Sequence, residues 1–147
     1  MIDRKNIYFT GVDRAGKSST RKKYAELSRQ VNITFDRSPT DNLVYDEVLR
    51  GNIYSDQYIK EFLDTFFPSA NNYIIFMSLD FKEINRRSKA TENIEYSKDE
   101  LTKTVNCFSR YFNRIKKFKK NITIIRVNCN KKTVDEIAQE IKTKLGE

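Results

Sequence analysis

Gly11-Val12-Asp13-Arg14-Ala15-Gly16-Lys17-Ser18 decides the fold, because it fits the pattern G-x-x-x-x-G-K-[ST]. A short run of β-branched and aromatic residues at 6–10 precedes it, and a helical pattern covers about 17–28 after it. Between a strand and a helix, the two glycines permit backbone turns that a Cβ would obstruct. The loop amides then point at an anion, with the positive end of the helix dipole behind them. The sequence therefore predicts a phosphate-binding loop; the alternative is a glycine-bearing turn that binds nothing.

Two side chains of this loop suit a nucleoside triphosphate. Lys17 has the length to reach the β- and γ-phosphates, and the hydroxyl of Ser18 can ligate Mg²⁺. We therefore expect ATP as the donor and Mg²⁺ as its metal. The nucleotide-binding residues that this predicts are Gly11, Val12, Asp13, Arg14, Ala15, Gly16, Lys17, Ser18 and Ser19.

Strands and helices alternate along the rest of the chain. Further apolar runs at 31–35, 73–79 and 122–127 are typical of strands that helices cover on both faces. Amphipathic helical patterns lie within 40–50, 58–66, 101–115 and 134–145, and capping boxes at Ser97–Glu100 and Thr133–Glu136 precede the last two. With the phosphate loop, this order predicts an α/β protein of the P-loop NTPase class. We expect a three-layer sandwich around a reduced, roughly four-stranded parallel sheet, with a helical lid.

Composition sets the remaining limits. The 147 residues fit a single domain over 1–147. Because there is no histidine and there are two cysteines, His/Cys zinc sites and His-based triads are excluded and a disulfide framework is not expected. No apolar run approaches the ~18–20 residues of a membrane span. We expect a protein of the cytoplasm, or of the host cytoplasm if the source is a virus, with no membrane partner.

A second polar constellation follows the second predicted strand, at Asp36-Arg37-Ser38. Ligands of open α/β sheets gather at the carboxyl ends of strands. Arg37 offers a bidentate fork to a phosphate, and Asp36 can hold Arg37 or a water on Mg²⁺. The alternative is a structural salt bridge at the end of the strand.

The loop, read on to Thr20, resembles the phosphate loop of thymidylate kinases. The resemblance implies that Arg14 touches the transferring phosphoryl group and that Asp13 faces the deoxyribose of the acceptor. It extends through 36–46, where Asp36, Arg37 and Tyr45 match the family and imply an acceptor site of Asp13, Asp36, Arg37 and Tyr45. Asp41 stands for a family serine, and Asp46 for an amide of the region that recognises thymine.

Residues 82–96 resemble the lid of nucleoside monophosphate kinases, whose arginines close over the donor phosphates and exclude water. Arg86 is the first candidate, with Arg87 and Lys89 as alternates; ordinary solvated helix charges are the other interpretation. The chain also departs from thymidylate kinases. It lacks the strand and helices that they place between the phosphate-loop helix and the Asp-Arg strand.

The sequence therefore predicts a kinase that transfers the ATP γ-phosphoryl group to a deoxynucleoside monophosphate, thymidylate-like, with Arg14, Lys17, Asp36, Arg37 and Arg86 as catalytic residues. One alternative acceptor is a 5′-hydroxyl of a deoxynucleoside or polynucleotide, which needs a carboxylate base such as Asp36. Another alternative is a non-catalytic nucleotide-binding protein. The formal net charge of +8 and a basic helix end at 110–120 also allow nucleic acid, as a less favoured partner. Analogy with thymidylate kinases implies a homodimer.

Overall fold

The structure is a computed structural model that describes residues 4–12, 15–28, 32–68, 71–91, 97–119 and 121–147, with the backbone alone at 88–91. Its centre is a sheet of four strands in the order β2-β1-β3-β4, in which every neighbouring pair is parallel. The strands are β1 (Asn6–Gly11), β2 (Ile33–Phe35), β3 (Asn72–Ser78) and β4 (Ile122–Asn128). This confirms the predicted α/β fold with a reduced parallel sheet.

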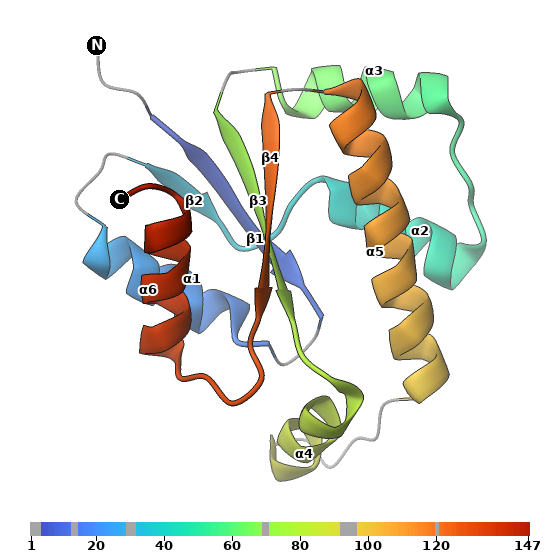
Figure 1. Ribbon diagram of the computed structural model, residues 1–147. Helices are drawn as coiled ribbons and strands as arrows, with labels where there is room; N and C mark the ends of the chain where they lie inside the picture. The colour runs from blue at the N-terminus through green and yellow to red at the C-terminus, as the bar shows by residue number, and fades with distance from the viewer. Residues whose placement is uncertain (1–3, 13–14, 29–31, 69–70, 92–96, 120) are drawn as a thin grey trace.

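Helices cover both faces of the sheet, so the molecule has three layers (Figure 1). In chain order they are α1 (Lys17–Leu27), α2 (Thr40–Arg50), α3 (Asp56–Phe66), α4 (Phe81–Thr91), α5 (Lys98–Phe118) and α6 (Val134–Lys144). Helices α1 and α6 pack on one face, α2, α3 and α5 lie on the other, and α4 lies beyond the carboxyl ends of the strands. Among the described residues, no helix is both long and apolar enough to cross a bilayer.

Alternation along β1 builds a separate core on each face. Ile7 and Phe9 are fully buried in the cluster under α1 and α6. Tyr8 points the other way, into the cluster with α2, α3 and α5. When successive side chains of a strand all enter a core, the sequence of the strand is a continuous apolar run. Such a run at 6–10 therefore predicted a strand that is covered on both faces.

The side chains predicted to cap the helices do so in the structure. Thr133 and Glu136 form the complete capping box, in which each side chain bonds the backbone amide of the other. At Ser97 the predicted box is half formed: the hydroxyl accepts a hydrogen bond from the amide of Glu100 at 3.4 Å, and the return bond to the Glu100 side chain is absent among the described contacts. Helix α3 begins at Asp56, before the predicted stripe, because the Ser55 hydroxyl caps its first turn.

The second strand is shorter than predicted. It forms over Ile33–Phe35 rather than 31–35, of which residue 31 lies outside the described part of the chain. It is an edge strand that pairs with β1 alone, so fewer partners fix its length. Ile33 and Phe35 remain 37% and 39% exposed, which leaves apolar surface at this edge.

Gly11 ends β1 against the backbone of β3, so we expect a side chain there to be excluded. Its φ is 136°, and a Cβ would lie 2.0 Å from the carbonyl oxygen of Met77. We predict that Gly11→Ala lowers the free energy of unfolding by about 3 kcal/mol or more, measured by urea denaturation. Gly51→Ala is the control, because Gly51 also has a positive φ but open space around it; it should lose only about 1 kcal/mol. Equal losses in the two variants would show that the contact with Met77 is unimportant.

Candidate functional site

The phosphate loop connects the buried strand β1 to helix α1. The amide of Val12 donates to the Met77 carbonyl at 3.2 Å, which ties the start of the loop to β3. Gly16, at φ 81°, is the N-cap of α1 in the left-handed region. The Lys17 ammonium folds back across the loop and donates to the Gly11 carbonyl at 2.9 Å. Asp13 and Arg14, which the sequence places in the middle of this loop, lie outside the described residues.

The first turn of α1 offers its amides at the mouth of the loop. Its cap, Gly16, has no side chain, and the turn contains no acidic residue to neutralise the positive end of the helix dipole. Ser18 and Ser19 are exposed at this turn. Backbone amides, a hydroxyl and an ammonium therefore converge here, which is the donor set that binds phosphate oxygens.

Asp36 faces α1 and is held by an arginine that the sequence did not single out. Its carboxylate accepts a hydrogen bond from Arg21 Nε at 2.5 Å, and Arg21 also lies 3.4 Å from the Thr34 hydroxyl. Arg21 follows Lys17 by one helical turn, so an ion pair joins the phosphate-loop helix to the end of β2. The partner of Asp36 is therefore Arg21 rather than Arg37.

Asp41 is the functional candidate that the sequence missed. It lies in the first turn of α2, is 8% exposed, and accepts a hydrogen bond from the Thr10 hydroxyl of β1 at 2.6 Å. Burial raises its pKa, against the smaller lowering effects of the Thr10 and Ser38 hydrogen bonds and of the positive charges of Lys17 and Arg37. A carboxylate in a Pro-Thr-Asp opening of a helix usually caps the helix, which is the only signal the sequence gives.

A pocket of about 390 Å³ opens beside Asp41, and we call it the Tyr8 pocket. Its floor includes Tyr8 and Phe35, whose rings stack with centroids 4.7 Å apart. Of the predicted acceptor residues, Arg37 and Tyr45 line it and Asp36 does not. The Tyr8 pocket therefore brings together two of the predicted residues with the unpredicted Asp41.

A second pocket, of about 440 Å³, lies between the phosphate loop and helices α2, α4 and α5. Val12 of the loop, Ile84 of α4 and Leu101 of α5 give it mainly apolar walls. Tyr45 lines this pocket as well, and its ring meets Phe108 edge-on at 6.1 Å. Tyr45 thus lines both cavities, of which the second also includes Val12 of the phosphate loop.

The two arginines of α4 have different environments. Arg86 and Arg87 both bond Glu83, and together they lower the pKa of this carboxyl to about 2. The Arg86 side chain is 68% exposed and that of Arg87 26%, and the positive charge of Arg87 reaches the buried Cys129 after β4. The remaining lid residues, 92–96, and the side chain of Lys89 lie outside the described part of the structure.

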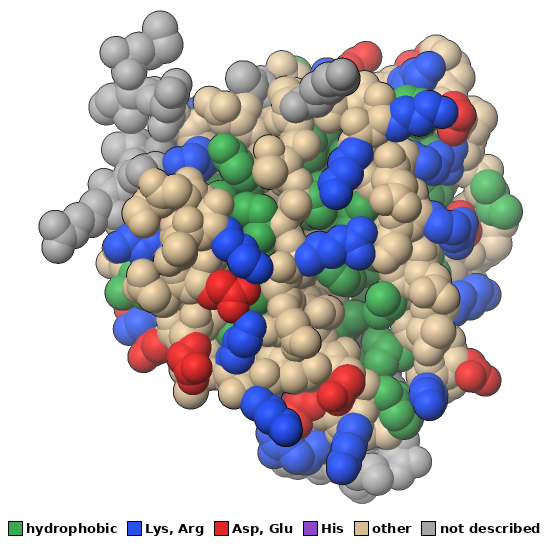
Figure 2. Space-filling model, in the orientation of Figure 1, with side chains coloured by type: hydrophobic (Ala, Val, Ile, Leu, Met, Phe, Trp, Pro, Cys, Tyr) green, Lys and Arg blue, Asp and Glu red, His purple; other side chains and the backbone are tan. Residues whose placement is uncertain are grey.

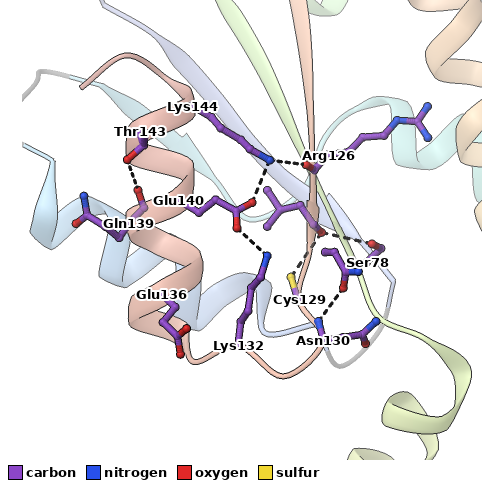
Figure 3. Close-up of polar contacts among 12 residues, drawn as sticks. Ser78, Arg126, Cys129, Asn130, Lys132, Glu136, Gln139, Glu140, Thr143 and Lys144 are labelled. Atoms are coloured by element: carbon purple, nitrogen blue, oxygen red, sulfur yellow. Dashed lines mark hydrogen bonds and ion pairs between the residues drawn. The ribbon is translucent and has the colours of Figure 1, made fainter.

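The loop after β4 leads into α6, and polar contacts hold it in place (Figure 3). The Asn130 side chain accepts a hydrogen bond from the Asp80 amide at 3.0 Å, so this loop is tied to the start of α4. Asp80 in turn caps α4 by accepting from the Glu83 amide at 2.9 Å. Lys132 and Lys144 both pair with Glu140 of α6, and Lys144 also donates to the Arg126 carbonyl of β4. These contacts tie the loop after β4 to the start of α4 and tie both this loop and β4 to α6.

Three basic residues at the end of α5 and just after it form ion pairs. Arg110 pairs with Glu47, Arg114 with Asp56, and Lys119 with Asp64. On the face in Figure 2, Lys and Arg side chains are spread over the surface with acidic groups among them. A nucleic-acid site usually has a continuous basic stripe that follows the phosphates, and on the face drawn in Figure 2 acidic side chains interrupt the basic ones.

Comparisons with known proteins agree with this fold. No family model matches the chain, and no curated protein matches its sequence. Among solved structures, the YorR protein of Bacillus subtilis in complex with phosphorylated GDP has a TM-score of 0.65 at 15% identity, over 96% of this chain and 95% of that one. Deoxyadenosine kinase from M. mycoides with bound dCTP has a TM-score of 0.65 at 13% identity, over 96% and 98% of the two chains. The same kinase with the products dCMP and dCDP has a TM-score of 0.57.

These likenesses show the predicted fold class, a P-loop α/β sandwich, which the chain shares with the YorR protein and deoxyadenosine kinase. The finer resemblance to thymidylate kinases stays a prediction, as do the roles of the individual site residues.

The buried carboxyl of Asp41 should destabilise the fold at neutral pH. Because its pKa is raised on folding, the stability that it contributes is complete below its unfolded pKa, near 3.8, and is lost as the pH rises through the folded pKa. Asn keeps an oxygen for the Thr10 hydroxyl but carries no charge. We predict that Asp41→Asn unfolds at higher urea concentration than the wild type at pH 7, and that the difference disappears toward acid pH.

The matched control is Asp64→Asn, at an exposed carboxylate of α3 paired with Lys119. It should show no gain in stability at neutral pH. The charged groups that face Asp41 are Lys17 and Arg37, and Tyr8 and Tyr45 line the same pocket. A loss of stability in Asp41→Asn at pH 7 would mean that the carboxylate is a net structural anchor.

Proposed function

We propose that this protein is a kinase that transfers the γ-phosphoryl group of ATP to a nucleoside-type acceptor. The observation that carries the proposal is the phosphate loop itself: Gly11 and Gly16 in glycine-specific conformations, with the Lys17 ammonium lying across the loop at its mouth. The shared fold with deoxyadenosine kinase supports it.

The donor triphosphate would lie on the amides at the start of α1. Lys17 would exchange its bond to the Gly11 carbonyl for the β- and γ-phosphates. Phosphoryl transfer needs positioning and charge neutralisation more than acid–base chemistry, and a fixed ammonium supplies both. A chain without histidine is therefore well suited to this reaction.

Mg²⁺ fits the residues present. Among the described residues there is no group of three acidic or sulfur ligands that would form a metal cage of its own. Mg²⁺ in kinase sites is usually held by few protein ligands, phosphate oxygens and water. The exposed Ser18 hydroxyl would hold it directly, and Asp36 through a water. When bound, the ion neutralises charge on the β- and γ-phosphates.

Arginines would supply the rest of the clamp. By resemblance, Arg14 contacts the transferring group, while Arg37 points into the Tyr8 pocket from the acceptor side. In α4, Arg86 is the predicted lid arginine. The more buried Arg87 lies closer to the loop after β4, so we propose that the two share this role.

The acceptor belongs to one of two chemical classes. A deoxynucleoside monophosphate, thymidylate-like, is the one the sequence favoured, with Asp13, Asp36, Arg37 and Tyr45 as its binding residues. A 5′-hydroxyl is the second candidate, and the buried carboxylate of Asp41 beside the Tyr8 pocket favours it. The homodimer and the cytoplasmic location remain predictions.

Removal of the Lys17 ammonium should abolish catalysis. We predict that Lys17→Ala lowers turnover by at least about 100-fold, measured with labelled ATP, Mg²⁺ and a panel of nucleosides, nucleoside monophosphates and 5′-hydroxyl DNA. Lys22→Ala removes an exposed cation from the same helix and should leave turnover unchanged. Normal turnover in Lys17→Ala would contradict the kinase assignment. ATP binding without product from any acceptor would instead indicate the non-catalytic alternative.

A further inference from the structure

Resting on the proposed kinase function, we propose that the phosphoryl acceptor is the 5′-hydroxyl of a nucleoside bound in the Tyr8 pocket, and that Asp41 accepts the proton of this hydroxyl. The pocket, its one buried carboxylate among the described residues, and the cations around it define this acceptor class.

Asp41 is held in a single orientation by contacts from two elements. Its Oδ1 accepts the short hydrogen bond from Thr10, the last residue before Gly11. Its Oδ2 lies 3.5 Å from the Ser38 amide, a contact at the weak limit of a hydrogen bond, so lone pairs remain for another donor. The carboxylate is therefore fixed against β1, immediately below the phosphate loop, and lines the Tyr8 pocket.

The two acidic candidates lie on opposite faces of the sheet. Thr34 and Asp36 contact Arg21 of α1, so Asp36 belongs to the α1 side. Phe35 stacks on Tyr8, and Tyr8 belongs to the core under α2, α3 and α5. The Tyr8 pocket is on this second side, and Asp41 rather than Asp36 lines it.

The charge of the acceptor distinguishes a nucleoside monophosphate from a nucleoside with a free 5′-hydroxyl. A phosphate monoester near neutral pH carries close to two negative charges, and placing it beside a buried carboxylate is unfavourable. A neutral hydroxyl has no such cost, and it needs a base that the phosphate does not need. The positive charges of Lys17 and Arg37 lower the pKa of Asp41 and so favour the ionised form, which is the form that accepts a proton, against the larger opposite effect of burial.

The stacked rings of Tyr8 and Phe35 give the pocket a place for a flat base. One face of Phe35 is covered by Tyr8, with the two ring planes 11° apart, while 39% of the residue remains exposed. Any nucleobase can stack on such an aromatic surface, because every base has a flat π face. The pocket volume of about 390 Å³ suits a nucleoside as well.

The step balances without any further reactant. The acceptor oxygen forms a bond to the γ-phosphorus of ATP while the bond from that phosphorus to the bridging oxygen of ADP breaks. The hydroxyl proton passes to an oxygen of Asp41, and ADP leaves with the electron pair of the broken bond. Asp41 then returns the proton to water.

The test compares acceptors and variants on the full chain. Wild type, Asp41→Asn and Asp64→Asn are each incubated with labelled ATP, Mg²⁺ and either the four common deoxynucleosides or their 5′-monophosphates. We expect product from deoxynucleosides, a loss of at least 100-fold in kcat for Asp41→Asn, and unchanged turnover for Asp64→Asn. ATP binding, measured by calorimetry, and the melting temperature should not fall in Asp41→Asn, because Asn can still accept from Thr10.

Phe35→Leu gives a second readout. It should raise the KM for the nucleoside several-fold and leave ATP affinity unchanged, because it removes the stacking surface and no group that touches the triphosphate. A purely structural role of Asp41 would lower ATP binding and the melting temperature together with kcat.

Other outcomes overturn the inference separately from the proposed function. Product from monophosphates alone, or full activity of Asp41→Asn on deoxynucleosides, leaves the kinase assignment standing and removes the hydroxyl acceptor and its base. Absence of ATP binding in the wild type overturns the kinase assignment, and the inference with it.

Discussion

The close approach of β1 to β3 at Gly11 is the constraint on which the site depends. At this point the backbone of β1 lies against the Met77 carbonyl with no room for a Cβ, and the next amide, that of Val12, bonds the same carbonyl. The chain therefore leaves the sheet in one direction, turns at Gly16 and enters α1 with its first amides facing the loop. The Lys17 ammonium donates to the Gly11 carbonyl and so lies at the loop, where we propose that the phosphates bind. This backbone contact thus fixes the point at which the chain leaves the sheet toward the first amides of α1, which are the groups we propose for binding phosphate.

The sheet then divides the acidic groups around this loop between its two faces. Successive residues of a strand point to opposite faces, so Thr34 and Phe35 send their side chains in opposite directions. On the side of α1, Arg21 bonds both Thr34 and Asp36. An exposed ion pair such as Arg21–Asp36 contributes at most about 1 kcal/mol to the free energy of unfolding. Asp41 stays on the side of α2, buried and hydrogen-bonded by Thr10. Burial of Asp41 raises the pKa of its carboxyl group.

The sequence predicted what depends on local pattern and missed what depends on which residues meet across the fold. The phosphate loop, all four strands and the parallel sheet follow from glycine spacing and apolar runs, because each of these signals lies within a few adjacent residues. The Thr133–Glu136 box was predictable for the same reason. The bond from Arg21 to Asp36 joins residues on different elements, and nothing in the pattern of α1 marks Arg21 among its basic neighbours. Asp41 was missed because a carboxylate in the first turn of a helix is ordinary, and its burial arises only when α2 packs over Thr10.

The short edge strand β2 leaves one side of the sheet open next to the proposed acceptor site. Strand β2 pairs with β1 over three residues and has no outer neighbour among the described strands, so Phe35, which lines the Tyr8 pocket, remains partly exposed. In the resemblance to thymidylate kinases, this is the part of the chain where a strand and helices are missing. An acceptor bound here would cover the open edge and bury the ring of Phe35, and it would shield Asp41 from water as well. The bound substrate would then cover the edge of the sheet that, in a longer kinase, further segments of the chain cover. The proton transfer would take place in a site from which water is largely excluded.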